Sequence, residues 1–280
     1  MSASVIDCLK CVILMSTLYG MSRTQTITSA ANPLLREVRR AITRNDLTDD
    51  GLCIAEGFHL LDEAVRSGRE VPTVLAAESA ITKLGHLETR IVAIPDALFQ
   101  TIASTETPQG VIALVRPAVW TIEQIFRGTS LVVVLDALQD PGNAGAIVRA
   151  AEAFGATGVL FLKGTASPYH PKTLRASAGS LFRVPFVAAL DATQARAALL
   201  KHRVAIYAAM PYTGTQKLAG ATDFVRTCAI IAGSEGRGVS KELRGIAEEV
   251  AIPTTGVESL NSAVATAVLL YEARRQRTEK

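Results

Sequence analysis

Three polar, glycine-containing segments of this 280-residue chain hold the side chains that could do chemistry. They span residues 136–149 (DALQDPGNAGAIVR), 233–238 (GSEGRG) and 252–261 (IPTTGVESLN). Each follows a short apolar run that is typical of a buried strand. Because ligands of an open parallel sheet bind beyond the carboxyl ends of its strands, these segments are the candidate ligand-binding loops.

The third segment ends where a loop meets a helix. Residues 254–259 are polar, and Leu, Val and Ala recur at helical spacing from Leu260 onward. Ser259, Leu260 and Asn261 therefore lie at a helix N-terminus, where backbone N–H groups lack partners. Ser and Asn are common capping residues, so a capped helix without any ligand is the plain alternative.

Familiar kinds of ligand loop fit these segments poorly. Gly142 and Gly145 lie between a strand and a helix, but they lack the full spacing of a dinucleotide-binding turn. Lys163 ends the next strand, where such a site needs an acidic residue. No Walker motif is present. A serine hydrolase centred on Ser234 or Ser259 would need a G-x-S-x-G elbow and a histidine partner, and the sequence offers neither near these loops.

Two successive α/β units must position the loops. Short apolar runs alternate with helical patterns over residues 23–116, which predicts a small α/β domain. Residues 117–125 are the expected linker. A second alternating series fills residues 126–280, and its lack of hairpin signals predicts a mainly parallel sheet that helices cover on both faces.

Composition is typical of a globular cytoplasmic protein. Hydrophobic residues make up 49% of the chain and charged residues 20%, which suits a large core. The cysteines do not suggest a disulfide framework, and Cys8 and Cys11 are interpreted as reduced thiols rather than a zinc or redox pair. Residues 1–22 are expected to be an N-terminal extension and a candidate for disorder, with Met21 as an alternative start to Met1. Its apolar run is too short and too charged to cross a membrane.

A basic helix is predicted directly after Asn32. The apolar residues of LLREVRRAI recur on one face at helical spacing. The other face holds four arginines, Arg36, Arg39, Arg40 and Arg44. The net charge of +3 permits a nucleic-acid partner without requiring one. We interpret the arginines as a stripe that contacts phosphates, with an ordinary solvated face as the alternative.

The three candidate loops, extended by their neighbours, resemble a known set of motifs. DPGNAGAIVRAAEAFGA, IIAGSEGRGVS and IPTTGVESLNSAVATAVLLYE resemble, in this order, the three motifs of SpoU-type RNA ribose 2′-O-methyltransferases of the SPOUT superfamily. The resemblance covers residues 126–275, and Thr254 stands where the family commonly has methionine. Residues 23–115 are similar to the substrate-binding domain of rRNA-modifying members, through NPLLREVRR, AEGFHLLDEA and TPQGVIALV.

The resemblance implies a fold, a cofactor and an assembly. The fold would be an α/β domain with a deep trefoil knot, which periodicity alone would not predict. The knot would bind S-adenosylmethionine, and the chain would form a homodimer through the C-terminal domain. The cofactor residues carried over are Gly233, Ile252 and Leu260, with Ala208 and Glu235 nearby.

The resemblance also assigns catalytic roles. Arg149 would act on the ribose 2′-hydroxyl, and because the pKa of arginine lies above about 12, an electrostatic role is favoured over that of a base. Asn143 and Asn261 would orient Arg149 and the RNA. Ser259 would hydrogen-bond within this cluster, and Glu235 would be an orienting carboxylate.

The sequence leaves alternatives open for the kind of RNA that is bound and for whether it is methylated. The N-terminal domain favours rRNA as the substrate, and its arginine stripe would then bind RNA. A tRNA ribose methyltransferase is the alternative within the same class. A catalytically silent RNA-binding scaffold is the alternative from a different class, and the presence of all five candidate catalytic residues argues against it.

Overall fold

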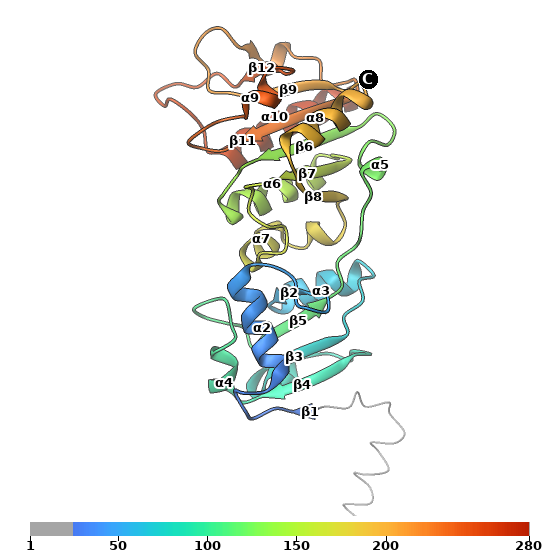
Figure 1. Ribbon diagram of the computed structural model, residues 1–280, viewed down its shortest axis with the longest axis vertical. Helices are drawn as coiled ribbons and strands as arrows, with labels where there is room; N and C mark the ends of the chain where they lie inside the picture. Colours follow the sequence, from blue (N-terminus) through green and yellow to red (C-terminus); the bar gives the residue numbers. More distant parts are fainter. Residues whose placement is uncertain (1–24, 280) are drawn as a thin grey trace, which may run out of the picture.

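The computed structural model describes residues 25–279, which contain two β-sheets at opposite ends of an elongated molecule (Figure 1). Helix α7 (Pro171–Ser177) lies between the two sheets. The expectations for the start of the chain, including Met21, Cys8 and Cys11, concern residues outside this range. No helix within residues 25–279 is long and apolar enough to span a membrane.

The N-terminal sheet is mixed and has the strand order β1-β4-β3-β5-β2. Strand β5 runs antiparallel to both β2 and β3, whereas β4 runs parallel to both β1 and β3. The strands are β1 (Gln25–Thr26), β2 (Cys53–Glu56), β3 (Thr73–Ala77), β4 (Arg90–Ile94) and β5 (Val111–Val115). The helices that pack on them are α2 (Pro33–Arg44), α3 (Phe58–Arg66) and α4 (Asp96–Gln100), with a 3-10 helix at Glu78–Lys83.

Helix α2 is the predicted amphipathic basic helix. The side chain of Asn32 accepts a hydrogen bond from the backbone N–H of Leu34, and a proline at the first helical position suits the helix start. Leu35, Val38 and Ala41 are fully buried against the sheet. The arginines therefore lie on the outer half of the helix, as the periodicity predicts.

The C-terminal sheet has the strand order β10-β12-β9-β11-β6-β7-β8, and every pairing within it is parallel. The prediction of a mainly parallel sheet is confirmed. The strands are β6 (Leu131–Asp136), β7 (Gly158–Leu162), β8 (Phe186–Leu190), β9 (Ala205–Ala209), β10 (Lys217–Leu218), β11 (Cys228–Gly233) and β12 (Glu248–Ala251).

Helices cover both faces of this sheet. Along β6, Val133 belongs to the core beneath α6 (Pro141–Ala153) and α10 (Ser262–Thr278). Its neighbour Val134 belongs to a separate core beneath α8 (Ala192–Lys201) and α9 (Lys241–Arg244). Burial on both faces explains why the strand is a continuous β-branched run rather than an alternating one.

Several element boundaries differ from those that the apolar patterns of the sequence predict, which include a strand over residues 184–187 and a helix over residues 173–180. Strand β8 begins at Phe186, after Pro185, whose ring nitrogen cannot donate to a ladder. Helix α7 ends at Ser177 because Ala178 and Gly179 adopt left-handed backbone angles. The expected linker contains a short helix, α5 (Ile122–Ile125), and the two-residue strands β1 and β10 have no periodic pattern that could predict them.

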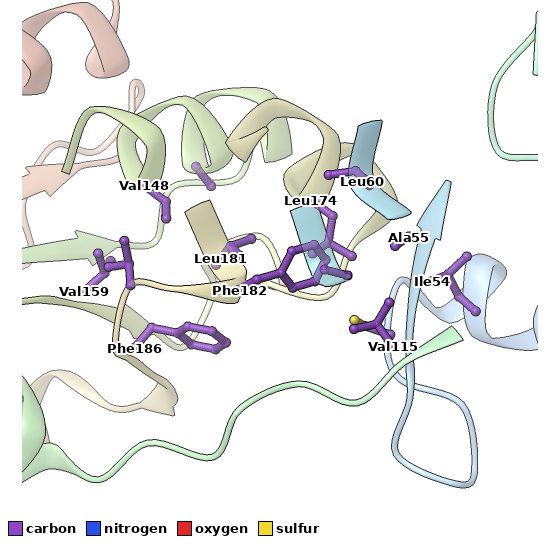
Figure 2. Close-up of a cluster of buried hydrophobic side chains, with 14 of the residues drawn as sticks. Ile54, Ala55, Leu60, Val115, Val148, Val159, Leu174, Leu181, Phe182 and Phe186 are labelled. Atoms are coloured by element: carbon purple, nitrogen blue, oxygen red, sulfur yellow. The ribbon is translucent and has the colours of Figure 1, made fainter. Parts of the chain in front are cut away.

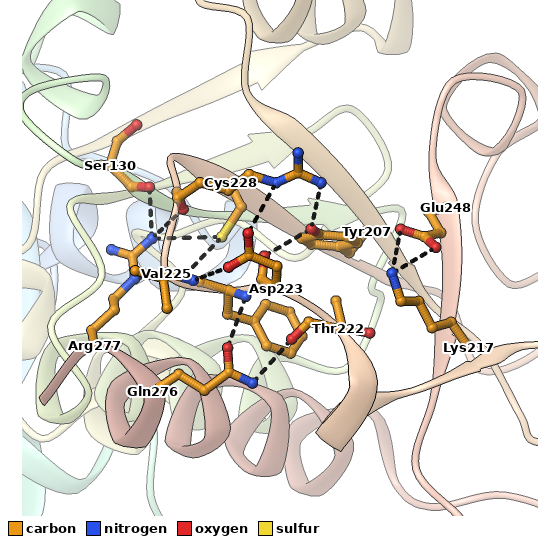
Figure 3. Close-up of polar contacts among 12 residues, drawn as sticks. Ser130, Tyr207, Lys217, Thr222, Asp223, Val225, Cys228, Glu248, Gln276 and Arg277 are labelled. Atoms are coloured by element: carbon orange, nitrogen blue, oxygen red, sulfur yellow. Dashed lines mark hydrogen bonds and ion pairs between the residues drawn. The ribbon is translucent and has the colours of Figure 1, made fainter. Parts of the chain in front are cut away.

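The last turns of α10 are fixed to the segment that precedes β11 (Figure 3). The guanidinium of Arg277 donates to the backbone carbonyls of Phe224, Thr129, Ser130 and Arg226, at 2.8 to 3.1 Å. Gln276 accepts from the backbone N–H of Phe224 at 3.0 Å. These bonds fix the register of α10, whose first turn forms part of the candidate site.

Candidate cofactor and catalytic site

A cavity of about 340 Å³ lies at the carboxyl edge of the C-terminal sheet. Its walls come from the segments that follow β9, β11 and β12 and from the first two turns of α10. Apolar side chains, including Val250, Leu260 and Leu269, line it together with the polar Ser234, Glu235 and others. This combination of mostly apolar walls and a few polar groups is typical of a small-molecule site.

Gly233 forms the floor of the second loop at the end of β11. The loop closes on itself, since the backbone N–H of Ser234 donates to the carbonyl of Gly238 at 3.1 Å and the reverse bond is 2.8 Å. A Cβ on Gly233 would lie 2.3 Å from the carbonyl carbon of Gly238. Glycine is therefore required so that the loop can fold back against its own strand.

The predicted cofactor residues fall into two groups. Gly233, Glu235, Ile252 and Leu260 all line the cavity. Ala208 does not: it is fully buried within β9, between β11 and β12.

Four lining residues at and after the end of β9 escaped sequence reasoning, because this segment has no unusual composition. They are Ala209, Met210, Pro211 and Tyr212. The usable signal was topological: a strand that pairs with β11 must end at the same carboxyl edge.

The cavity suits S-adenosylmethionine in size and chemistry. Its apolar walls can cover the adenine ring, and it is large enough for a small-molecule ligand. The backbone at Gly233 approaches the cavity where any side chain would displace the 234–239 segment. Glu235, Ile252 and Leu260 are the residues of this chain that would contact such a ligand from the second and third loops.

A chain of hydrogen bonds joins the three candidate loops. The side-chain amide of Asn261 donates to Oδ1 of Asn143 at 3.1 Å, and the amide of Asn143 donates to Oε1 of Glu235 at 2.7 Å. Asn261 also caps α10, since its Oδ1 accepts from the backbone N–H groups of Ala263 and Val264. Asn261 thus both caps the helix and bonds to the first loop, so the capped-helix alternative does not exclude the functional interpretation.

The first loop is held in place at both ends. Asp140 caps α6 by accepting from the backbone N–H of Asn143 at 2.7 Å, and Lys172 of α7 pairs with its other oxygen at 3.1 Å. The backbone bond from Asn143 and the bond from Lys172 lower the pKa of Asp140. Upstream, the buried Asp136 accepts from the backbone N–H of Ser240 at 2.7 Å, which fixes the second loop to the end of β6.

Arg149 and Ser259 lie outside this hydrogen-bonded cluster. Ser259 lines the cavity and is exposed. Arg149 is exposed on α6, and its side chain makes no hydrogen bond or ion pair with any residue between 25 and 279. The single chain therefore places Asn143, Glu235 and Asn261 together and leaves the Arg149 guanidinium free.

The arginine stripe of α2 is divided by its contacts. Arg40 and Arg44 both pair with the exposed carboxylate of Asp49, at 2.6 and 3.0 Å. Arg39 instead donates to the carbonyl of Ala30 and to both the carbonyl and the hydroxyl of Thr101. The guanidinium of Arg39 is thus engaged within its own domain, and the phosphate-binding role of the stripe stays a prediction.

Within the described residues, Arg36 is the member of the stripe whose side chain makes no hydrogen bond or ion pair. Arg40 and Arg44 can exchange Asp49 for a phosphate, because exposed ion pairs contribute at most about 1 kcal/mol.

Comparison with known protein families divides the chain into the same two parts. Residues 130–271 match the SpoU rRNA Methylase family, and residues 32–113 match the MRM3-like substrate binding domain.

Individual relatives match over nearly the whole chain. A 23S rRNA guanosine 2′-O-methyltransferase of Bacillus subtilis is 32% identical over 89% of this chain and 98% of its own length. A 23S rRNA uridine 2′-O-methyltransferase of Streptomyces viridochromogenes is 32% identical over 84% of this chain and 86% of its own length. The SpoU methyltransferase AviRb of the same organism, solved in complex with AdoMet, has a TM-score of 0.77 at 26% identity and covers 88% of this chain and 98% of its own.

Proposed function

Because the chain belongs to the SpoU rRNA methylase family, we propose that it transfers a methyl group from S-adenosylmethionine to a ribose 2′-hydroxyl of rRNA. The observation that carries the proposal is the bonded chain Asn261–Asn143–Glu235, which joins the three candidate loops beside the cavity. Two relatives of equal identity are named for guanosine and for uridine, so the ribose is the chemistry that they share.

The residues of the site support this reaction by placement and charge. Bound S-adenosylmethionine supplies an electrophilic methyl group. The attacking hydroxyl would displace S-adenosylhomocysteine from the methyl group and pass its proton to a phosphate oxygen of the RNA, so a fixed positive charge near the ribose oxygen stabilises the negative charge that develops there. Arg149 is proposed to supply this charge. Asn143, held by Asn261 and Glu235, is proposed to orient the RNA, and Ser259 to hydrogen-bond at the rim of the cavity.

A second cavity supports a place for the RNA next to the first. It measures about 240 Å³ and lies between the first and second loops, with walls that include Gln139, Asp140 and Arg237. Ser234, Glu235 and Gly236 line both cavities. We propose that the reacting nucleotide enters here, so that Glu235 lies between the two ligands.

A homodimer through the C-terminal domain is part of the proposal. Helix α10 buries Leu269 and Leu270, yet Val264, Val268 and Tyr271 are exposed by 50%, 39% and 55%. These three recur at helical spacing and form an apolar stripe on a helix that packs against α6. A second copy that covers this stripe would lie beside α6, where the Arg149 side chain is free.

The trefoil knot and the cytoplasmic location remain proposals that rest on the family. Helix α10 contacts both β11 and α6, and β12 lies between β10 and β9 in the sheet order. Free, buried Cys53 and Cys228 suit a reducing compartment.

The choice of rRNA over tRNA rests on the match of residues 32–113 to a substrate-binding domain. Mapping of 2′-O-methylation in total RNA from a deletion strain tests it. One rRNA ribose should lose its methyl group and regain it when the gene is restored. Loss confined to tRNA would select the alternative substrate, and an unchanged map would favour the silent scaffold.

A further inference from the structure

The N-terminal part of the chain is locked onto the catalytic helix α6 through contacts that the reaction itself does not use. The chain link between the two sheets is a single stretch, residues 116–130, which by itself would permit hinge motion. Apolar side chains from both parts nevertheless interdigitate in the junction (Figure 2). Leu174 and Phe182 of the second part lie beside Ala55 and Leu60 of the first, and all four belong to one continuous buried core.

Arg183 bridges the two parts directly. Its guanidinium binds both oxygens of Glu152, at 2.5 and 3.0 Å, and Glu152 lies on α6. The same guanidinium donates to Glu63 of α3 at 2.5 Å and to Ser67 at 3.1 Å. The carboxylates of Glu152 and Glu63 raise the pKa of Arg183 above its ordinary value, so its guanidinium stays positively charged in the bridge.

Arg175 makes a second bridge, through α7. It donates to the hydroxyl of Ser104 at 2.6 Å and pairs at 3.4 Å with Glu56, whose side chain is only 3% exposed. Glu56 also accepts from the backbone N–H of Ser104 at 2.9 Å and from Thr105 at 2.5 Å. A buried carboxylate with several donors is a fixed anchor rather than a surface charge.

Close packing connects both bridges to α6. A Cβ on Gly145 of α6 would lie 2.4 Å from the carbonyl oxygen of Thr173, so α6 and α7 are in backbone contact. A Cβ on Gly179 would lie 2.6 Å from Cβ of Glu63, so the backbone after α7 touches α3 in the same way. Tilting the first sheet would therefore displace the helix that carries Asn143.

We propose that Arg175 and Arg183 are positioning residues that fix the RNA-binding part at one distance and angle from the methyl-transfer site. The substrate class is then RNA that is already folded, in which the recognised element and the reacting ribose keep a set separation. A flexible single strand would gain nothing from a rigid spacer. This inference rests on the proposed function for its RNA, and on the junction contacts for its geometry.

Distance measurements by pulsed electron spin resonance test the geometry without RNA. Labels are placed on the exposed Thr43→Cys and Thr193→Cys, with Cys8 and Cys11 changed to serine and Cys53 and Cys228 left buried. The distance distribution should be narrow, and it should broaden when Arg175→Met and Arg183→Met are combined. Arg196→Met removes an exposed arginine without partners in the described chain and should leave the distribution narrow.

Kinetics on unmodified rRNA transcript test the consequence. A loosened junction lowers the effective concentration of the reacting ribose at the site while the RNA remains bound. The double variant should therefore keep its affinity for the transcript and for S-adenosylmethionine, while kcat falls about tenfold. Glu63→Gln weakens one end of the Arg183 bridge and should show a smaller fall in kcat. It replaces the double variant in this test if that variant does not fold.

Two results would overturn the inference: a broad distribution in the wild-type protein, or unchanged kcat in a variant whose distribution has broadened. A wild-type protein with a narrow distribution that methylates no RNA would instead contradict the proposed function. The two failures are thus told apart by the spin-label measurement.

Discussion

Arg149 and Asn143 lie on the same helix but have opposite surroundings. Asn143 is held on both sides by hydrogen bonds, whereas the Arg149 side chain is free among the described residues of the single chain. A cation without internal partners is available to a developing negative charge, because no carboxylate already neutralises it. On the basis of this difference we assign orientation of the RNA to the asparagine and charge stabilisation to the arginine.

Arg149→Ala should lower the turnover number by about a hundredfold or more while S-adenosylmethionine affinity stays near normal. The cavity is lined without Arg149, so its loss should not reshape the cofactor site. Calorimetric titration with the cofactor and a labelled-methyl assay on rRNA measure the two quantities. Arg149→Lys should recover little, because a point charge cannot replace a planar, two-pronged donor. Full turnover by the alanine variant would remove Arg149 from the mechanism.

Gly233→Ala should weaken cofactor binding by displacing the loop rather than by filling the cavity. The added Cβ would collide with backbone atoms of Gly238 and Val239, so the 234–239 segment must shift. We expect S-adenosylmethionine affinity to fall at least about tenfold, with the protein still folded. Gly220→Ala is the matched control, since its Cβ meets nothing within 4 Å and lies outside the cavity. Equal affinities for the two variants would contradict the role of this turn.

At the scale of the element, α10 has one buried and one exposed apolar face. Low charge in its first turns predicts burial, but periodicity cannot say whether the core or a second subunit provides it. The exposed stripe of Val264, Val268 and Tyr271 is the part that the single chain leaves uncovered.

Replacing Val264 and Val268 with aspartate should convert a dimer into a monomer. Burying these charges between two subunits would cost several kcal/mol, whereas on a free surface they cost little. Light scattering at micromolar concentration gives the mass. Val119→Asp, at a side chain that is 93% exposed and outside α10, should not change it. A wild-type monomer would contradict the proposed assembly.

The bridge of Arg183 gives the junction a pH dependence. Hydrogen bonds from Arg183 lower the pKa of Glu152 below its ordinary 4.5. A carboxyl whose pKa is depressed by folding stabilises the folded state above the unfolded pKa, and this contribution is lost as the pH falls through the folded value. Between about pH 7 and about pH 3, the wild type should lose more stability than Arg183→Met. Urea denaturation at both pH values measures the free energy of unfolding of each protein. Equal losses of stability in the two proteins would mean that the Arg183–Glu152 pair contributes nothing.

At the scale of the whole molecule, the sequence predicted the two α/β units and the three loops better than it predicted the contacts that hold them together. Asn32 and the arginine periodicity were sufficient to place α2, because capping and amphipathicity are local. The bond between Asn143 and Glu235 joins residues 92 positions apart, and only the motif resemblance brought them together beforehand. No local pattern marks Arg175 or Arg183, since their carboxylate partners lie 31 to 120 positions away in the sequence.

The arginine stripe should set the salt dependence of RNA binding. Changing Arg36, Arg40 and Arg44 to alanine should reduce the slope of log affinity against log salt by about one for each phosphate that is no longer neutralised. Cofactor affinity should not change. Arg39→Ala should instead lower the stability of the N-terminal part, because Arg39 binds Ala30 and Thr101. Filter binding at several salt concentrations measures the slope, and an unaltered slope would mean that the stripe is an ordinary solvated face.

The most direct test of ribose methylation is nucleoside analysis after a reaction in vitro. Purified protein is incubated with unmodified rRNA transcript and S-adenosylmethionine carrying a labelled methyl group, and the RNA is digested to nucleosides for mass spectrometry. The label should be found in a single 2′-O-methylnucleoside, and Arg149→Ala should reduce it by about a hundredfold. Label on a base, or cofactor binding without any transfer to RNA, would contradict the assignment of the ribose 2′-hydroxyl as the methyl acceptor.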